Sequence, residues 1–160
     1  MTPHMLNAKY QMLIEALDGM PRDLERLTRR VDEAAALMRP APGAWCIKDV
    51  IAHLAEVEEL FRACFARIVE QDDPYEPCIH PESGEHDLGR DLRELIALFA
   101  ARRASTTAYL RTLDHRQWLR TCVHEAHGRI KLRRQVEFLI GHDNEHLAQI
   151  VTIRECMEGA

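Results

Sequence analysis

The sequence has 160 residues, of which 46% are hydrophobic and 29% are charged, and its formal net charge is -5 at pH 7. This composition is typical of one globular domain, residues 1–160, that buries roughly two-thirds of the surface exposed by its unfolded chain. The acidic balance excludes a basic surface for nucleic acid, so the arginines are interpreted as solvated helix faces and ion pairs.

Two features of the sequence predict a cytoplasmic protein. The five cysteines are odd in number and show no Cys-x-x-Cys spacing, which argues against a disulfide framework or a zinc knuckle. The first residues form no basic segment followed by an apolar core, and no apolar run approaches the roughly 20 residues of a membrane helix. We therefore expect a soluble chain with neither a membrane nor a nucleic acid as its partner.

The first predicted helix is interrupted. A helical pattern covers about residues 5–17, stops at Gly19, and resumes after Pro21 as far as Val31. Proline suits the first turn of a helix and disfavours its interior, so we expect a break at these residues. A short further turn ends near Met38, before a segment rich in proline.

The second predicted helix spans about residues 47–71 and places a histidine on its apolar face. Apolar side chains recur there at three- and four-residue steps. They are Val50, Leu54, Val57, Phe61, Cys64, Phe65 and Ile68. His53 falls within this stripe. Burying an imidazole without a bonding partner costs on the order of 1–3 kcal/mol of folding free energy. We therefore expect His53 to be either a core histidine held by hydrogen bonds or a metal ligand.

An irregular crossover loop, residues 72–89, leads to the third predicted helix. Its Pro, Asp, Glu and Gly content indicates an exposed connection in which His80 and His86 are expected to be solvated, with a loop that covers the mouth of a pocket as the alternative. The third helix covers about residues 88–113, and Arg103 interrupts its apolar stripe. Two interpretations of Arg103 stay open: a boundary arginine whose charge reaches water, or a cation that lines the substrate pocket for an anionic substrate.

The fourth predicted helix, about residues 131–157, carries a histidine pair. Residues 114–129 before it lack apolar periodicity, so His124 and His127 are assigned to a surface turn outside the site. On the helix, His142 and His146 lie four residues apart and project from one face. Two imidazoles so placed form half of a metal site, because zinc and nickel bind neutral imidazole nitrogen. His53 is the candidate third ligand.

Other interpretations of the histidine pair fit the sequence less well. A helix-face histidine is often only a hydrogen-bonded boundary residue. The segment His142-x-x-Glu145-His146 also matches the inverted zinc-protease pattern, but such peptidases take their last ligand far downstream. A carboxylate-bridged di-iron bundle requires Glu-x-x-His pairs on two helices, which this sequence does not supply.

The order and spacing of motifs along nearly the whole chain resemble the DinB/YfiT-like family. The matching residues are Pro42-Gly43-x-Trp45, His53, Glu58, Gly128-x-Ile130 and His142-Asp143-x-x-His146-x-x-Gln149-Ile150. The resemblance implies an all-α four-helix bundle with unusual connectivity and long crossover loops, often forming a homodimer. It also implies a divalent ion bound by three histidines, which map onto His53, His142 and His146.

The resemblance further implies a small-molecule enzyme, without fixing its reaction. An open three-histidine site would activate water or a low-molecular-weight thiol, for a hydrolase or a thiol S-transferase. Zinc or nickel is the expected ion, with iron or manganese as further options. Glu56 and Glu145, the acidic residues nearest in sequence to the ligands, are candidates for a base or for a group that orients the ligands. The alternative is a non-catalytic metal- or ligand-binding stress-response module.

Overall fold

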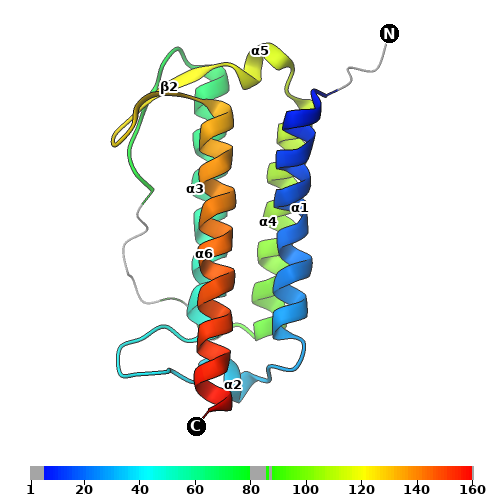
Figure 1. Ribbon diagram of the computed structural model, residues 1–160, viewed down its shortest axis with the longest axis vertical. Coiled ribbons are helices and arrows are strands. Elements are labelled where there is room, and N and C mark those ends of the chain that lie inside the picture. Colours follow the sequence, from blue (N-terminus) through cyan, green and yellow to red (C-terminus); the bar gives the residue numbers. More distant parts are fainter. Residues whose placement is uncertain (1–5, 80–85, 87, 160) are drawn as a thin grey trace.

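The computed structural model describes residues 6–79, 86 and 88–159, and four long helices form its body (Figure 1). These helices are α1 (Ala8–Thr28), α3 (Ile47–Glu70), α4 (Leu92–Thr112) and α6 (Leu132–Glu158). α1 packs against α4 and α6, and α3 packs against the same two helices. The predicted four-helix bundle is confirmed, and α3, α4 and α6 begin and end within a few residues of their predicted bounds.

The connectivity of the bundle is unusual because two consecutive long helices are parallel. α1 descends in the view of Figure 1, α3 and α4 both ascend, and α6 descends again. The connection between α3 and α4 must therefore return along the length of the bundle. This arrangement makes α3 and α6 antiparallel neighbours, so residues far apart in sequence face each other across one helix pair.

Side-chain caps fix where the helices begin. Asp91 accepts a hydrogen bond from the backbone N–H of Arg93 at 2.7 Å, and its own N–H donates to Glu94, which starts α4. The short helix α2 (Glu33–Leu37) begins in the same manner at Asp32, which accepts from the N–H of Ala35. Such caps satisfy N–H groups that have no partner within the helix.

The predicted break in the first helix is wrong, because α1 runs without interruption through Gly19 and Pro21. Proline has no N–H, so the carbonyl oxygen of Leu17, four residues earlier, loses its helical hydrogen bond. The guanidinium of Arg103 on α4 donates to this oxygen at 2.9 Å. A tertiary contact therefore offsets part of the cost of the proline.

A second correction concerns residues 114–129, which are ordered and do not form an irregular turn. They contain α5 (His115–Trp118) and the strands β2 (Thr121–His124) and β3 (Gly128–Lys131). The strands pair antiparallel, and β1 (Tyr75–Glu76), from the crossover loop, pairs parallel with β2. Gly128 has φ +68°, a conformation that favours glycine, where the hairpin turns back.

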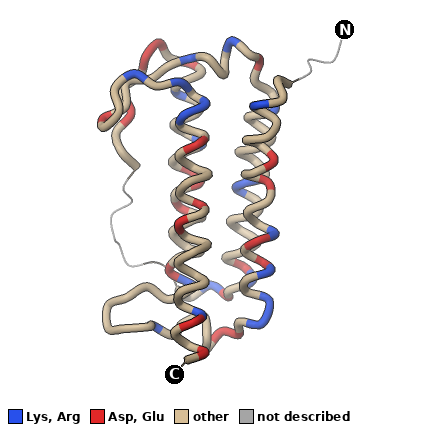
Figure 2. The backbone as a smooth tube through the Cα atoms, viewed as in Figure 1, with Lys and Arg blue, Asp and Glu red and all other residues tan. Residues whose placement is uncertain are grey.

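The interior of the bundle is mostly apolar, apart from a few buried charged side chains such as Arg103, Glu58 and Asp143, and most charges lie on its outside. Buried residues form one cluster around Ile51 and Phe99 and a second around Phe65 and Trp118. Acidic and basic residues are interspersed along the helices (Figure 2). None of the described helices combines the length and the apolar character needed to span a membrane.

Candidate metal centre

Three histidines from two helices converge at the interface of α3 and α6. The Nε2 atom of His142 lies 3.1 Å from the Nε2 atoms of both His53 and His146. Two ligands of a tetrahedral ion with bonds of 2.0–2.1 Å stand roughly 3.3 Å apart, so the donor set fits one metal ion. Within the described part of the chain, no fourth side chain joins this group. The structure thus brings together all three predicted ligands.

The environment keeps two of these imidazoles neutral, which is the form that binds metals. Burial, together with smaller effects of His146 and His86, lowers the pKa of His53 to about 4. Burial also lowers the pKa of His142 to about 3, with additional contributions from His146, His53 and Arg103. Near pH 7 both groups therefore offer a nitrogen lone pair without first having to release a proton.

Neighbouring side chains orient the histidine rings. Gln149 Oε1 lies 2.8 Å from Nδ1 of His146, so Nδ1 carries the proton and Nε2 is left as the lone-pair donor. The Trp45 ring packs 5.0 Å from the ring of His53 and stacks at 6.3 Å on that of His146, measured between centroids. The buried Nδ1 atom of His142 has no hydrogen-bond partner among the described residues.

His86 is not solvated, contrary to the sequence-based prediction. Its side chain is only 4% exposed, and its Nδ1 atom lies 3.1 Å from Oδ1 of Asp49. Its ring meets Trp45 edge-on at 5.0 Å and lies 6.3 Å from the ring of His53. The crossover loop therefore reaches the metal centre at this residue. His80 lies outside the described residues.

Arg103 occupies a position that neither interpretation of the sequence anticipated. Its side chain is 1% exposed and donates paired hydrogen bonds to Glu58 on α3 and to Asp143 on α6. Its charge therefore does not reach water. It is also absent from the described lining of the cavity beside His142. With the bond to Leu17, it links all four long helices, and through Asp143 it contacts the part of α6 that carries His142.

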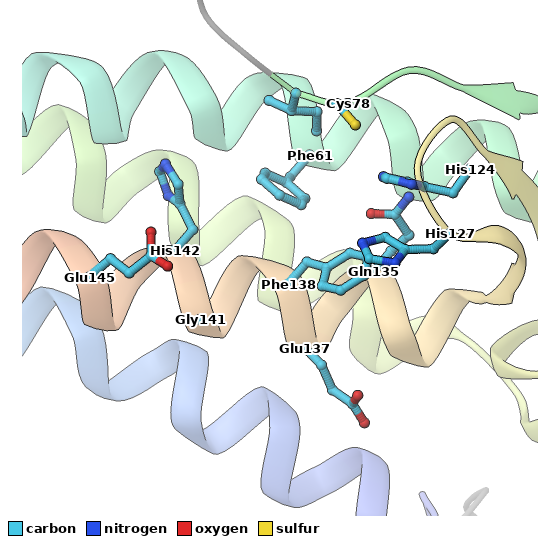
Figure 3. A pocket seen from close by; sticks show the side chains of 11 residues that line it. Phe61, Cys78, His124, His127, Gln135, Glu137, Phe138, Gly141, His142 and Glu145 are labelled. Atoms are coloured by element: carbon cyan, nitrogen blue, oxygen red, sulfur yellow. The ribbon is translucent and has the colours of Figure 1, made fainter.

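A cavity of about 310 Å³ adjoins the metal centre on one side (Figure 3). His142 forms part of its lining at one end, together with Glu145. The other candidate base, Glu56, lines a separate hollow between α3 and α4 with Arg90 and Arg102. The structure thus separates two carboxylates that the sequence could not distinguish.

The far end of the cavity is formed by residues that the sequence pattern predicts to lie in a surface turn. His124 and His127 of the β2–β3 hairpin lie there with Phe138 of α6 (Figure 3). The prediction that His124 and His127 lie in a surface turn away from the site is therefore wrong, because both residues line the cavity. The available signal was Gly128 between two short runs that contain the β-branched residues Thr121, Val123 and Ile130, which is typical of a short hairpin.

Comparisons with known proteins agree with this architecture. Residues 16–150 match the family described as the DinB superfamily. YfiT from Bacillus subtilis, described as a probable metal-dependent hydrolase with an unusual four-helix bundle topology, superposes with a TM-score of 0.78 at 22% identity, covering 99% of this chain and 94% of that one.

Two further solved structures share the fold. TT2238, a four-helix bundle protein, has a TM-score of 0.66 at 20% identity over 89% of this chain and 98% of its own. A conserved protein from Enterococcus faecalis has a TM-score of 0.69 at 18% identity over 94% and 97% of the two chains. No curated protein matches the chain in sequence.

Proposed function

Because the chain belongs to the DinB superfamily, we propose that it is a divalent-metal-dependent hydrolase whose ion is bound by His53, His142 and His146. One observation carries the proposal: three Nε2 atoms converge, with no fourth described ligand, beside a cavity that His142 helps to line. A structural zinc site is usually closed by four protein ligands, whereas a catalytic site leaves a position open. The description of YfiT as a probable metal-dependent hydrolase supports the same reaction class.

Zinc or nickel suits the three-imidazole donor set best, with iron or manganese as further options. A divalent ion supplies Lewis-acid chemistry at such a site, by polarising a carbonyl or phosphoryl group and by making water more acidic. The protein contributes the fixed orientation of the imidazoles, through Gln149 and Trp45.

Glu145 is the residue that we propose as the general base. It is exposed, lies on the same helix as His142 and His146, and lines the cavity. Its carboxylate would accept the proton of the attacking water as the new bond to the substrate forms. The same proton would then pass to the leaving group as the scissile bond breaks, so that one water is consumed and Glu145 is regenerated.

Thiol S-transfer and non-catalytic metal binding are the competing functions. In thiol transfer, a low-molecular-weight thiol would take the place of water at the open position. In a binding module, the ion would only hold α3 and α6 together. A homodimer and a cytoplasmic location stay predictions from the family resemblance and the composition.

Elemental analysis of protein purified without a metal-affinity column tests the site. We expect one divalent ion per chain in the wild type and in His127→Ala, and little in His53→Ala, His142→Ala and His146→Ala. Loaded protein is then assayed with nitrophenyl esters, amides and phosphates, and separately with thiols and an electrophile. Metal-dependent hydrolysis that falls about 10²- to 10⁴-fold in Glu145→Gln but not in Glu56→Gln supports the proposal.

Two results would contradict the proposal. A wild type that contains no metal and cannot be loaded would make the histidines structural. Thiol transfer without hydrolysis by the loaded protein would favour the transferase.

A further inference from the structure

The cavity beside His142 has a chemical character that limits what it can bind. At about 310 Å³ it lies at the small end of ligand sites, which typically span roughly 300–1,000 Å³. His142 stands at one end of it, and His124 and His127 stand at the other (Figure 3). A substrate whose reacting group lies at the metal centre must therefore place the rest of its body against the hairpin.

Aromatic rings form the walls that such a body would meet. The rings of His127 and Phe138 lie 5.0 Å apart between centroids, and those of His124 and His127 lie 5.1 Å apart. Phe61 contributes another ring from α3. These rings pack against one another, and the aromatic surface that they form favours a planar apolar group lying against it, which gains both burial and ring stacking.

Two polar groups at the hairpin end, His124 and Cys78, favour their uncharged forms. Burial lowers the pKa of His124, with a further contribution from His127. The backbone N–H of Ala126 donates to His124 Nδ1 at 3.1 Å, which requires a lone pair on that nitrogen. Burial and then Glu125 raise the pKa of the Cys78 thiol, which therefore stays protonated.

Among the described residues that line the cavity, no lysine or arginine is present to compensate for an anion. These residues include Glu137 and Glu145. Glu137 points away from the cavity in Figure 3 and pairs with Arg133 and Arg134. Arg134 stacks on Phe138 at 4.8 Å, but its charge is shared with that carboxylate.

We propose that the cavity selects small substrates with a planar apolar body and no anionic group remote from the reacting atoms. This inference rests on the proposed open metal site and names its substrate class: esters or amides of uncharged aromatic or similarly flat groups. A carboxylate at the hairpin end would lose part of its hydration against the aromatic rings without gaining a cation among the described lining residues. Anionic thiols such as glutathione fall outside this class.

Binding of hydroxamates to the zinc-loaded protein tests the inference, because the hydroxamate group anchors every probe to the metal in the same manner. The probes are acetohydroxamate, benzhydroxamate and 4-carboxybenzhydroxamate, with dissociation constants measured by calorimetry. We expect benzhydroxamate to bind about tenfold more tightly than acetohydroxamate, because its ring is buried. The 4-carboxy compound should bind several-fold more weakly than its parent.

Substitutions at the hairpin end locate the effect. Phe138→Ala should reduce the advantage of benzhydroxamate over acetohydroxamate. His127 is exposed, so a longer side chain is tolerated there, and His127→Lys should make the 4-carboxy compound the tighter ligand. His127→Gln, a neutral substitution at the same position, should not make the 4-carboxy compound the tighter ligand. Glu56→Gln, in the separate hollow, should leave all three constants unchanged.

The possible outcomes separate the inference from the proposed function. If the carboxylate probe binds the wild type as tightly as benzhydroxamate, or if the aromatic ring gives no advantage, the substrate class is wrong while the open metal site stands. If no hydroxamate binds the loaded protein, both the open site and the inference are overturned.

Discussion

The guanidinium of Arg103 donates a hydrogen bond of 2.9 Å to the carbonyl oxygen of Leu17, which Pro21 leaves without its helical partner. The same guanidinium binds Glu58 and Asp143. One side chain therefore satisfies a defect in α1 and joins α3, α4 and α6. Asp143 directly follows the metal-ligand candidate His142, so the arginine also fixes the helix segment that carries the site.

Replacement of Arg103 should destabilise the protein strongly. Arg103→Met leaves two buried carboxylates and one carbonyl oxygen without a partner, and we expect a loss of about 3–5 kcal/mol in the free energy of unfolding. Urea denaturation of the metal-free protein measures this loss. Arg111→Met is the matched control, because Arg111 pairs with Asp18 at the surface and should cost less than about 1 kcal/mol. If Arg103→Met also cost less than about 1 kcal/mol, the role of Arg103 in joining the four long helices would be contradicted.

The course of α1 shows what local sequence patterns omit. Gly19 and Pro21 are ordinary signals for a helix end, and the prediction of a break followed from them. The partner that supports a continuous helix is Arg103, on a different element and far along the chain. Its position in an apolar stripe was visible in the sequence, but its contacts depend on how α1, α3 and α6 pack around α4.

The candidate site was predictable to the extent that it follows helix periodicity. The spacing of His142 and His146 and the apolar stripe around His53 determine which helix faces carry imidazoles. The hairpin end of the cavity was not predictable in this way. β2 and β3 are short, and β2 also pairs with β1 from the crossover loop, so His124 reaches the cavity through contacts between distant segments.

Metal binding should stabilise the fold through the three histidines. An ion that binds only the folded chain adds about 2.7 kcal/mol to the free energy of unfolding at a free concentration one hundred times its dissociation constant. We expect zinc to raise the melting temperature of the wild type and of His127→Gln, and chelation to reverse the rise. The melting temperature of His142→Ala should not respond to zinc. An equal response in that variant would place the ion elsewhere.

Trp45 should report on occupancy of the site by fluorescence. Its ring lies 5.0 Å from His53 and 6.3 Å from His146, whereas Trp118 belongs to α5, at the other end of the bundle (Figure 1), where it stacks on Tyr10 of α1. Copper, a strong quencher at such distances, should remove most of the emission of Trp118→Phe and little of that of Trp45→Phe. Trp118→Phe loses no hydrogen bond, because Nε1 of Trp118 has no partner among the described residues.

A quenching pattern opposite to this one would place the copper near α5. Zinc serves as the control ion, because it occupies imidazole sites without quenching by electron or energy transfer. Prior loading with zinc should therefore protect the emission of Trp45 from copper in proportion to occupancy.

His124 should make the stability of the metal-free protein depend on pH. Burial, followed by His127, lowers the pKa of His124 from its ordinary value of 6.5, so the folded state favours the neutral ring. The stability that this provides is complete above pH 6.5. It is lost as the pH falls through the lowered folded-state pKa, because the unfolded chain binds the proton first.

The comparison of the wild type with His124→Asn isolates this contribution. Asparagine does not titrate, and its side-chain oxygen can still accept the N–H of Ala126. Urea denaturation at pH 7.5, 6.5 and 5.5 should show a steeper loss of stability in the wild type than in the variant, while His53 and His142 contribute equally to both. Parallel curves would mean that His124 binds its proton as readily in the folded state as in the unfolded chain.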